Sequence, residues 1–166
     1  MLQHPGHASL HSAVTLTPVA CGRGGPGNDV AADSVVVLLH GLGADGADLI
    51  GLAPDFSRLL PRTAFLSPDA PEPCDMAPYG RQWFSLQDRT PDIVAEQAAN
   101  AGPHLDAWLD QVLQRFGLPA SRMALVGFSQ GTMMALQVGF RRPEPLAGIV
   151  GFSGGLTGVE KFSAEV

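Results

Sequence analysis

Cysteine is scarce in this sequence, which has only Cys21 and Cys74 among its 166 residues. Two cysteines so far apart exclude a disulfide framework and a cysteine-ligated zinc site, so both thiols are expected to be reduced. Charged residues are also few, at 16%, and no apolar run approaches the length of a membrane-spanning helix. This composition, with frequent glycine and proline, is typical of a compact α/β enzyme with tight turns.

Positive charge is in short supply as well. The chain has 10 lysines and arginines against 16 aspartates and glutamates, which gives a net charge of −6 and an isoelectric point near 5.2. This balance argues against nucleic acid or an anionic membrane as a partner. Residues 1–7 have neither the basic start nor the apolar stretch of a signal peptide, so we expect a cytoplasmic protein.

The start of the chain has an unusual share of the histidines, namely His4, His7 and His11. Their spacing could hold a metal ion, but no acidic or cysteine partner is nearby, so the sequence predicts no metal site. Residues 1–12 are instead expected to be flexible. No motif calls for a cofactor.

Hydrophobic residues make up 45% of the chain, which is enough for one core and a single domain over residues 1–166. Ala13–Val19 is expected to be an edge strand, and Asp48–Leu60 to be helical but interrupted at Pro54. Strands that alternate with helices predict a mostly parallel sheet with right-handed crossovers. The expected buried strands are Ser34–Leu39, Thr63–Leu66, Met123–Val126 and Leu146–Phe152.

The longest helical pattern covers Pro91–Phe116, where apolar residues recur every three or four positions. Gly102-Pro103 is expected to kink this helix or to start a fresh one, and Gly117 is expected to end it. Three polar residues fall on its expected solvent side and are interpreted as ordinary surface residues: His104, Asp106 and Asp110.

The most informative stretch begins with the strand Met123–Val126, which runs directly into Gly127-Phe128-Ser129-Gln130-Gly131 and then into a helical segment. Strand, G-x-S-x-G and helix in this order predict a nucleophile elbow, a turn so tight that glycines are needed beside the serine. The new helix would point its N-terminal N–H groups at the reacting atom. Ser129 is therefore the predicted nucleophile.

A second G-x-S-x-G match lies at Gly151–Gly155. Ser153 is followed by two glycines and then Leu156, Thr157 and Gly158, which hold a helix only at a large entropic cost. This context favours a loop serine at the end of a strand, where it could line the same cleft.

Glycines also follow the central strand, in the segment His40-Gly41-Leu42-Gly43-Ala44-Asp45-Gly46. They indicate a loop whose backbone N–H groups face a ligand, and no phosphate-binding fingerprint is present. His40 is interpreted as a buried histidine bonded to loop backbone rather than as a general base.

Further on, Ser67–Pro78 is expected to be an irregular proline-rich loop. Trp83 is expected to be either a lid over an apolar pocket or an anchor of this loop, and Phe84 an anchor.

Together these motifs resemble the α/β-hydrolase phospholipase/carboxylesterase family, which includes acyl-protein thioesterases and small bacterial carboxylesterases. The resemblance implies an α/β-hydrolase fold with helices on both faces of the sheet, and attack of Ser129 on an ester or thioester carbonyl. It also implies an oxyanion hole from the N–H groups of Leu42 and Gln130, with Trp83 in the acyl-binding region. The segments that carry it are Val35–Leu52, Ser67–Ala70, Arg81–Ser85, Gly127–Gly131 and Gly151–Leu156.

The sequence departs from this family after Ser129, where it has neither an aspartate nor a histidine. In the α/β-hydrolase fold the triad follows the chain order Ser, Asp or Glu, His. We therefore expect a C-terminally truncated, incomplete domain whose serine lacks its base. The alternatives are a fragment of an active hydrolase, a non-catalytic binding module or pseudoenzyme that keeps the pocket, and an acyltransferase or haloperoxidase-like member of the fold. A bare edge at Leu146–Phe152 would favour marginal stability, aggregation or a homodimer.

Overall fold

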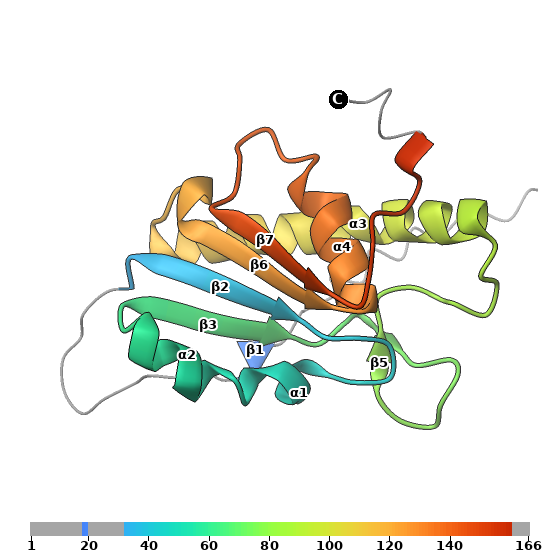
Figure 1. The fold of residues 1–166 in the computed structure, drawn as a ribbon, viewed down its shortest axis with the longest axis horizontal. Coiled ribbons are helices and arrows are strands. Elements are labelled where there is room, and N and C mark those ends of the chain that lie inside the picture. Colours follow the sequence, from blue (N-terminus) through green and yellow to red (C-terminus); the bar gives the residue numbers. More distant parts are fainter. Residues whose placement is uncertain (1–17, 20–31, 161–166) are drawn as a thin grey trace, which may run out of the picture.

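The computed structural model describes residues 18–19 and 32–160 (Figure 1). The predictions for residues 1–12, for the three histidines among them and for Cys21 lie outside these residues. Within the described part the chain alternates strands with helices, as the sequence predicted. No helix in that part is long and apolar enough to cross a membrane.

Within these residues a five-stranded sheet runs through the middle of the fold. Its strands, in chain order, are β1 (Pro18–Val19), β2 (Ser34–Leu39), β3 (Thr63–Pro68), β6 (Met123–Phe128) and β7 (Gly148–Phe152). They lie side by side in the order β1-β3-β2-β6-β7. The three pairs formed among β3, β2, β6 and β7 are all parallel, whereas β1 pairs with β3 in the antiparallel direction. The predicted mostly parallel sheet is therefore confirmed.

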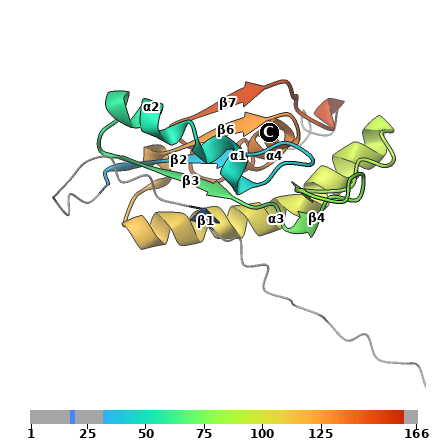
Figure 2. The ribbon, with the colours of Figure 1, turned by 90° about the horizontal axis from the view of Figure 1, so that it is seen from below.

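Helices lie on both faces of the sheet, with α1 (Gly46–Ile50) and α2 (Ala53–Leu59) on one face and α3 (Pro91–Phe116) on the other (Figure 2). α4 (Gln130–Gly139) packs against α3. The predicted interruption at Pro54 is present, because α1 ends at Ile50 and Pro54 lies in the first turn of α2. There the missing proline N–H leaves no helical hydrogen bond unmade.

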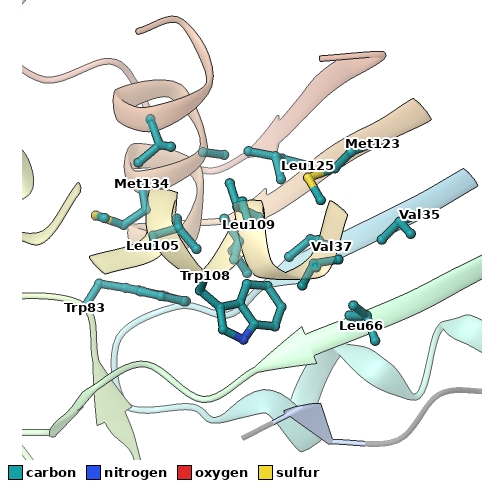
Figure 3. Packing of buried hydrophobic residues seen from close by; sticks show 14 of the residues in the cluster. Val35, Val37, Leu66, Trp83, Leu105, Trp108, Leu109, Met123, Leu125 and Met134 are labelled. Carbon is teal, nitrogen blue, oxygen red and sulfur yellow. The ribbon is translucent and has the colours of Figure 1, made fainter. Parts of the chain in front are cut away.

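The main core fills the space between the sheet and the helices α3 and α4 (Figure 3). Alternate residues of the parallel strands point into it, because side chains on a strand alternate between faces. α3 contributes Leu105, Trp108 and Leu109, which recur at helical spacing as predicted. Other members are Val35, Val37, Leu66, Trp83, Met123, Leu125 and Met134.

α3 runs without a break through Pro103. The expectation of a fresh helix at this proline is therefore wrong, since burial of the apolar face of α3 on both sides of Pro103 offsets the lost hydrogen bond. The predicted end of the helix is confirmed. Gly117 has a φ of 65°, and its N–H bonds back to the last turn, as in a glycine C-cap.

Two aspartates of α3 lie on its solvent side, as the sequence predicted, with side chains 44% and 64% exposed, but they also make an ion pair that the sequence did not predict. Asp106 and Asp110 both accept hydrogen bonds from the guanidinium of Arg142, just beyond α4. The Arg142 side chain is only 7% exposed. The helical pattern of α3 could not reveal this pair of contacts, because their partner lies in a distant segment of the chain.

The proline-rich loop contains one regular feature that the sequence did not predict. β4 (Glu72–Pro73) and β5 (Arg81–Gln82) form a two-stranded antiparallel arm. The expectation of an irregular loop over Ser67–Pro78 is therefore wrong at β4. Pro73 argues against a strand in a sequence pattern, because proline cannot donate a hydrogen bond to a partner strand. Within sheets it is confined to edge strands, to the first residue of a strand or to bulges.

β7 is the edge of the sheet within the described residues. Its residues Val150 and Phe152 are 49% and 55% exposed, and they lie opposite Val126 and Phe128 of β6. The bare apolar edge that the sequence indicated is thus present in this part of the chain. Association of two copies through this edge stays a prediction.

Candidate active site

Ser129 occupies the turn between β6 and α4 and has a φ of 51°. Positive φ is unfavourable for a residue with a side chain, so this turn is strained. The glycines beside it are there because the backbone is crowded. A Cβ on Gly127 would lie 2.5 Å from the Gly131 carbonyl oxygen, and one on Gly131 would lie 2.0 Å from that of Leu39. The geometry is that of the predicted strand–turn–helix elbow.

The backbone of Ser129 is hydrogen-bonded on both sides. Its N–H donates to the Phe152 carbonyl at 2.8 Å, and its own carbonyl accepts from the N–H groups of Thr132 and Met133 at 3.0 and 3.3 Å. The serine is partly exposed, and within the described chain no side chain is hydrogen-bonded to its hydroxyl. A strained backbone held in this way leaves the hydroxyl free to meet a ligand.

The glycine loop after β2 lies directly beside this serine. A Cβ on Gly41 would be 3.4 Å from the Ser129 Cβ. A hydrogen bond of 3.2 Å from the Ala44 N–H to the Gly41 carbonyl closes a turn over Leu42 and Gly43. In such a turn the N–H of the second residue is not used, and among the described residues the Leu42 N–H has no acceptor. The predicted oxyanion residue therefore carries an unused donor in a loop that borders Ser129.

The arm made by β4 and β5 holds this loop in place. The Gly43 N–H donates to the Arg81 carbonyl at 2.9 Å, and the Arg81 N–H donates to the Ala44 carbonyl at 2.8 Å. The Arg81 guanidinium also reaches the carbonyls of Ala70 and Pro71. One arginine thus joins the glycine loop to the segment after β3.

Gln130 is the first residue of α4, so its backbone N–H has no partner within its own helix. Its side chain is fully buried and makes two hydrogen bonds to one neighbouring segment. Oε1 accepts from the Trp83 N–H at 2.9 Å, and Nε2 donates to the Phe84 carbonyl at 2.7 Å. The family resemblance implied an oxyanion-hole role for the Gln130 N–H, which stays a prediction. It gave no sign of these side-chain contacts, which depend on a segment far away in the chain.

Trp83 has the contacts of an anchor, which is one of its two predicted roles. It is 3% exposed, and its indole N–H donates to the His40 carbonyl at 2.9 Å. The centroids of the Trp83 and His40 rings lie 5.5 Å apart. Phe84 is buried beside it, also as an anchor. A part for Trp83 in acyl binding stays a prediction.

His40 is a buried histidine bonded to backbone, as predicted. Its Nδ1 is 2.8 Å from the Gly41 carbonyl, and its Nε2 accepts from the Ala70 N–H at 2.9 Å. These partners require a neutral ring that carries its proton on Nδ1. Burial lowers the pKa of His40 below 6.5, although the Gly41 carbonyl and, more weakly, Asp69, Asp45 and Asp48 oppose this shift.

We expect acid to destabilise the protein through His40. The folded pKa lies below the unfolded value, so the unfolded chain binds a proton first as the pH falls below about 6.5. As the pH falls from the unfolded pKa to the folded pKa of His40, this group should lower the free energy of unfolding by up to about 1.4 kcal/mol per pH unit. Urea unfolding measured from about pH 7.5 down to about pH 5 checks this. The variant His40→Gln should be less stable at neutral pH but should show a shallower decline, and an unchanged decline would exclude His40 as the cause.

The remaining described histidine, His104, lies exposed on α3. Both nitrogens of His40 are already bonded to backbone. The second serine motif forms no helix, as predicted, and Ser153 also has a positive φ of 53°. The structure therefore brings together Ser129, Gln130 and the Leu42 loop but shows no histidine on the Ser129 hydroxyl in the region described.

Comparison with known proteins gives a consistent result. Residues 27–166 match the family described as phospholipase/carboxylesterase. Esterase YpfH of Escherichia coli (strain K12) is 30% identical over 129 residues, which cover 76% of this chain and 54% of the esterase. Acyl-protein thioesterase 1 of Schizosaccharomyces pombe (strain 972 / ATCC 24843) is 32% identical over 143 residues, which cover 82% of this chain and 62% of that protein.

Solved structures support the same fold. The crystal structure of esterase PE8 matches with a TM-score of 0.80 at 41% identity, over 91% of this chain and 68% of that chain. A carboxylesterase from Mesorhizobium loti, at 19% identity, matches with a TM-score of 0.61 and shows the fold alone. These matches confirm the predicted α/β-hydrolase fold. The chain spans little more than half the length of the two curated relatives.

Proposed function

Because this chain belongs to the phospholipase/carboxylesterase family, we propose that it provides the serine nucleophile of a hydrolase for carboxylic esters or thioesters. The observation that carries the proposal is the conformation of Ser129. A partly exposed serine with a φ of 51°, between a buried strand and the start of a helix, is the arrangement that presents a hydroxyl for attack on a carbonyl.

The chemistry follows from the groups around this hydroxyl. Ser129 Oγ bonds to the carbonyl carbon of the substrate, and the carbonyl oxygen becomes an oxyanion. The N–H groups of Leu42 and Gln130 are the proposed donors to that oxygen, since neither N–H has a hydrogen-bond acceptor among the described residues. Collapse of the intermediate breaks the bond to the leaving oxygen or sulfur, which takes up the proton lost by Ser129 and departs as an alcohol or a thiol. Water then attacks the acyl-serine, which releases a carboxylic acid and restores the serine hydroxyl. Trp83 is proposed to border the acyl chain.

The proton of the Ser129 hydroxyl must go to a base, and a serine without one is a weak nucleophile. His40 does not fit this task, because accepting a proton on Nε2 would break its hydrogen bond with the Ala70 N–H. The other described histidine, His104, lies exposed on α3. The lack of a base at the Ser129 hydroxyl among the described residues favours a second candidate function, a binding module that retains the hydrolase pocket without turnover.

Labelling with a fluorophosphonate, together with hydrolysis of p-nitrophenyl acetate and butyrate, distinguishes the two candidates. We expect the chain to be labelled at Ser129, identified by peptide mass spectrometry, and the variant Ser129→Ala to lose both labelling and turnover. The matched control is Ser121→Ala, an exposed serine just before the other end of β6, which should behave like the wild type.

The contrary outcomes are equally clear. Labelling at Ser153 with Ser129 unlabelled would contradict the assignment of the nucleophile. No labelling in a sample that circular dichroism shows to be folded would favour the binding module.

A further inference from the structure

The second serine motif, Gly151–Gly155, has no role in the proposed chemistry, yet it lies against the Ser129 turn. β7 ends at Phe152, beside the end of β6. The Phe152 carbonyl accepts the hydrogen bond from the Ser129 N–H at 2.8 Å. The end of β7 therefore holds the backbone of the serine itself.

Thr132, in the first turn of α4, links the two motifs a second time. It is 1% exposed. Its hydroxyl oxygen lies 2.7 Å from the Gly127 carbonyl and 2.9 Å from the Phe152 carbonyl, and it accepts from the Phe152 N–H at 3.0 Å. One buried hydroxyl thus contacts the end of β6 just before Ser129 and both backbone groups of Phe152.

The segment after Phe152 also lies close to the Ser129 turn. A Cβ on Gly154 would lie 2.4 Å from the Ser129 carbonyl oxygen and 2.6 Å from the Thr132 Cβ. A Cβ on Gly155, by contrast, would meet nothing within 4 Å. The glycine at position 154 is therefore needed for this contact, whereas its neighbour is not.

We propose that Thr132, Phe152 and Gly154 form a clamp that holds Ser129 in its positive-φ conformation, with Thr132 as a positioning residue for the nucleophile. The proposal rests on the proposed function of Ser129. A strained backbone conformation persists only where its surroundings over-determine it, and the clamp supplies that constraint from a separate strand. It keeps the Ser129 hydroxyl aligned with the Gln130 N–H, because a small misplacement of a reacting atom is costly in rate.

Two pairs of variants test the clamp. Thr132→Val removes the hydroxyl but keeps a similar shape, whereas Thr132→Ser keeps the hydroxyl and removes only the methyl group. Gly154→Ala puts a methyl group against the Ser129 carbonyl, whereas Gly155→Ala is its matched control. We expect Thr132→Val and Gly154→Ala to slow fluorophosphonate labelling by about 10-fold to 100-fold. Thr132→Ser should restore most of the rate, and Gly155→Ala should stay within about 2-fold of the wild type.

Amide hydrogen exchange followed by NMR gives a readout that needs no turnover. In Thr132→Val the N–H groups of Ser129 and Phe152 should exchange faster, while core amides such as that of Val37 keep their protection. Uniformly faster exchange would mean general destabilisation rather than a clamp. Unchanged exchange at Ser129 in both Thr132→Val and Gly154→Ala would overturn the proposal. If Thr132→Val showed this exchange pattern while the wild type was not labelled, the proposed function would be contradicted and the clamp would remain supported.

Discussion

Replacing Gly131 with alanine is expected to lower the free energy of unfolding by about 3 kcal/mol or more and to abolish labelling of Ser129. The new Cβ would lie 2.0 Å from the Leu39 carbonyl oxygen and 2.8 Å from that of His40. Both neighbours are backbone atoms at the carboxyl end of the central strand β2, so neither can rotate away. Relief requires α4 to move off the sheet, and that movement would displace the Ser129 turn.

Helix propensity alone predicts that this substitution would raise the free energy of unfolding, since alanine is favoured over glycine in a helix by up to about 1 kcal/mol. The matched control is Gly102→Ala in α3, where the added Cβ would meet side-chain atoms no closer than 3.7 Å. Gly102→Ala should leave the free energy of unfolding unchanged or raise it slightly. Urea unfolding of the two variants compares them directly. Equal stability of Gly131→Ala and the wild type would mean that α4 does not pack on β2 as described.

The second large effect is expected at the Gln130 side chain. Gln130→Leu has a similar volume but leaves the Trp83 N–H and the Phe84 carbonyl buried without partners. At about 1–3 kcal/mol for each orphaned group, the loss should be about 2–6 kcal/mol. It should also slow labelling of Ser129, because the 83–84 segment and the serine turn are joined through this one residue.

Equilibrium unfolding and the labelling rate are the two measurements for Gln130→Leu. An exposed glutamine of α3 provides the control, since Gln114→Leu should change stability by no more than about 0.5 kcal/mol. If Gln130→Leu proved as stable as Gln114→Leu, water or a rearranged backbone would have to satisfy the two groups. That result would remove the proposed link between Gln130 and the 83–84 segment.

Local patterns were sufficient to predict the main elements of this fold. The recurrence of apolar residues predicted α3, and the β-branched run Ser34–Leu39 predicted the central strand. The serine turn was predictable too, because glycine is needed wherever backbone segments approach this closely. Those signals lie within one turn or one strand, so the sequence alone displays them.

Contacts between distant segments could not be predicted in this way. Arg142 pairs with two aspartates of α3, and the Gln130 side chain bonds to the backbone at residues 83 and 84. Neither arrangement has a sequence spacing that marks it. The strands β4 and β5 were missed for a related reason, since each has only two residues and one contains a proline. For the side-chain contacts of Gln130, the only signal was a glutamine directly after the serine, and its burial is not visible in a sequence.

The strand order has a consequence for how the molecule assembles. β2 pairs on one side with β3, which follows it along the chain, but on the other side with β6, which lies beyond the whole of α3. Contacts between remote segments form slowly, because a long loop must close before they contribute any stability. α3 can form from neighbouring residues, whereas the Ser129 turn exists only once β2, β6 and β7 lie side by side. We therefore expect the Ser129 turn to form late in folding, so that a chain that has only collapsed would contain Ser129 and Gln130 without the turn that exposes the serine hydroxyl.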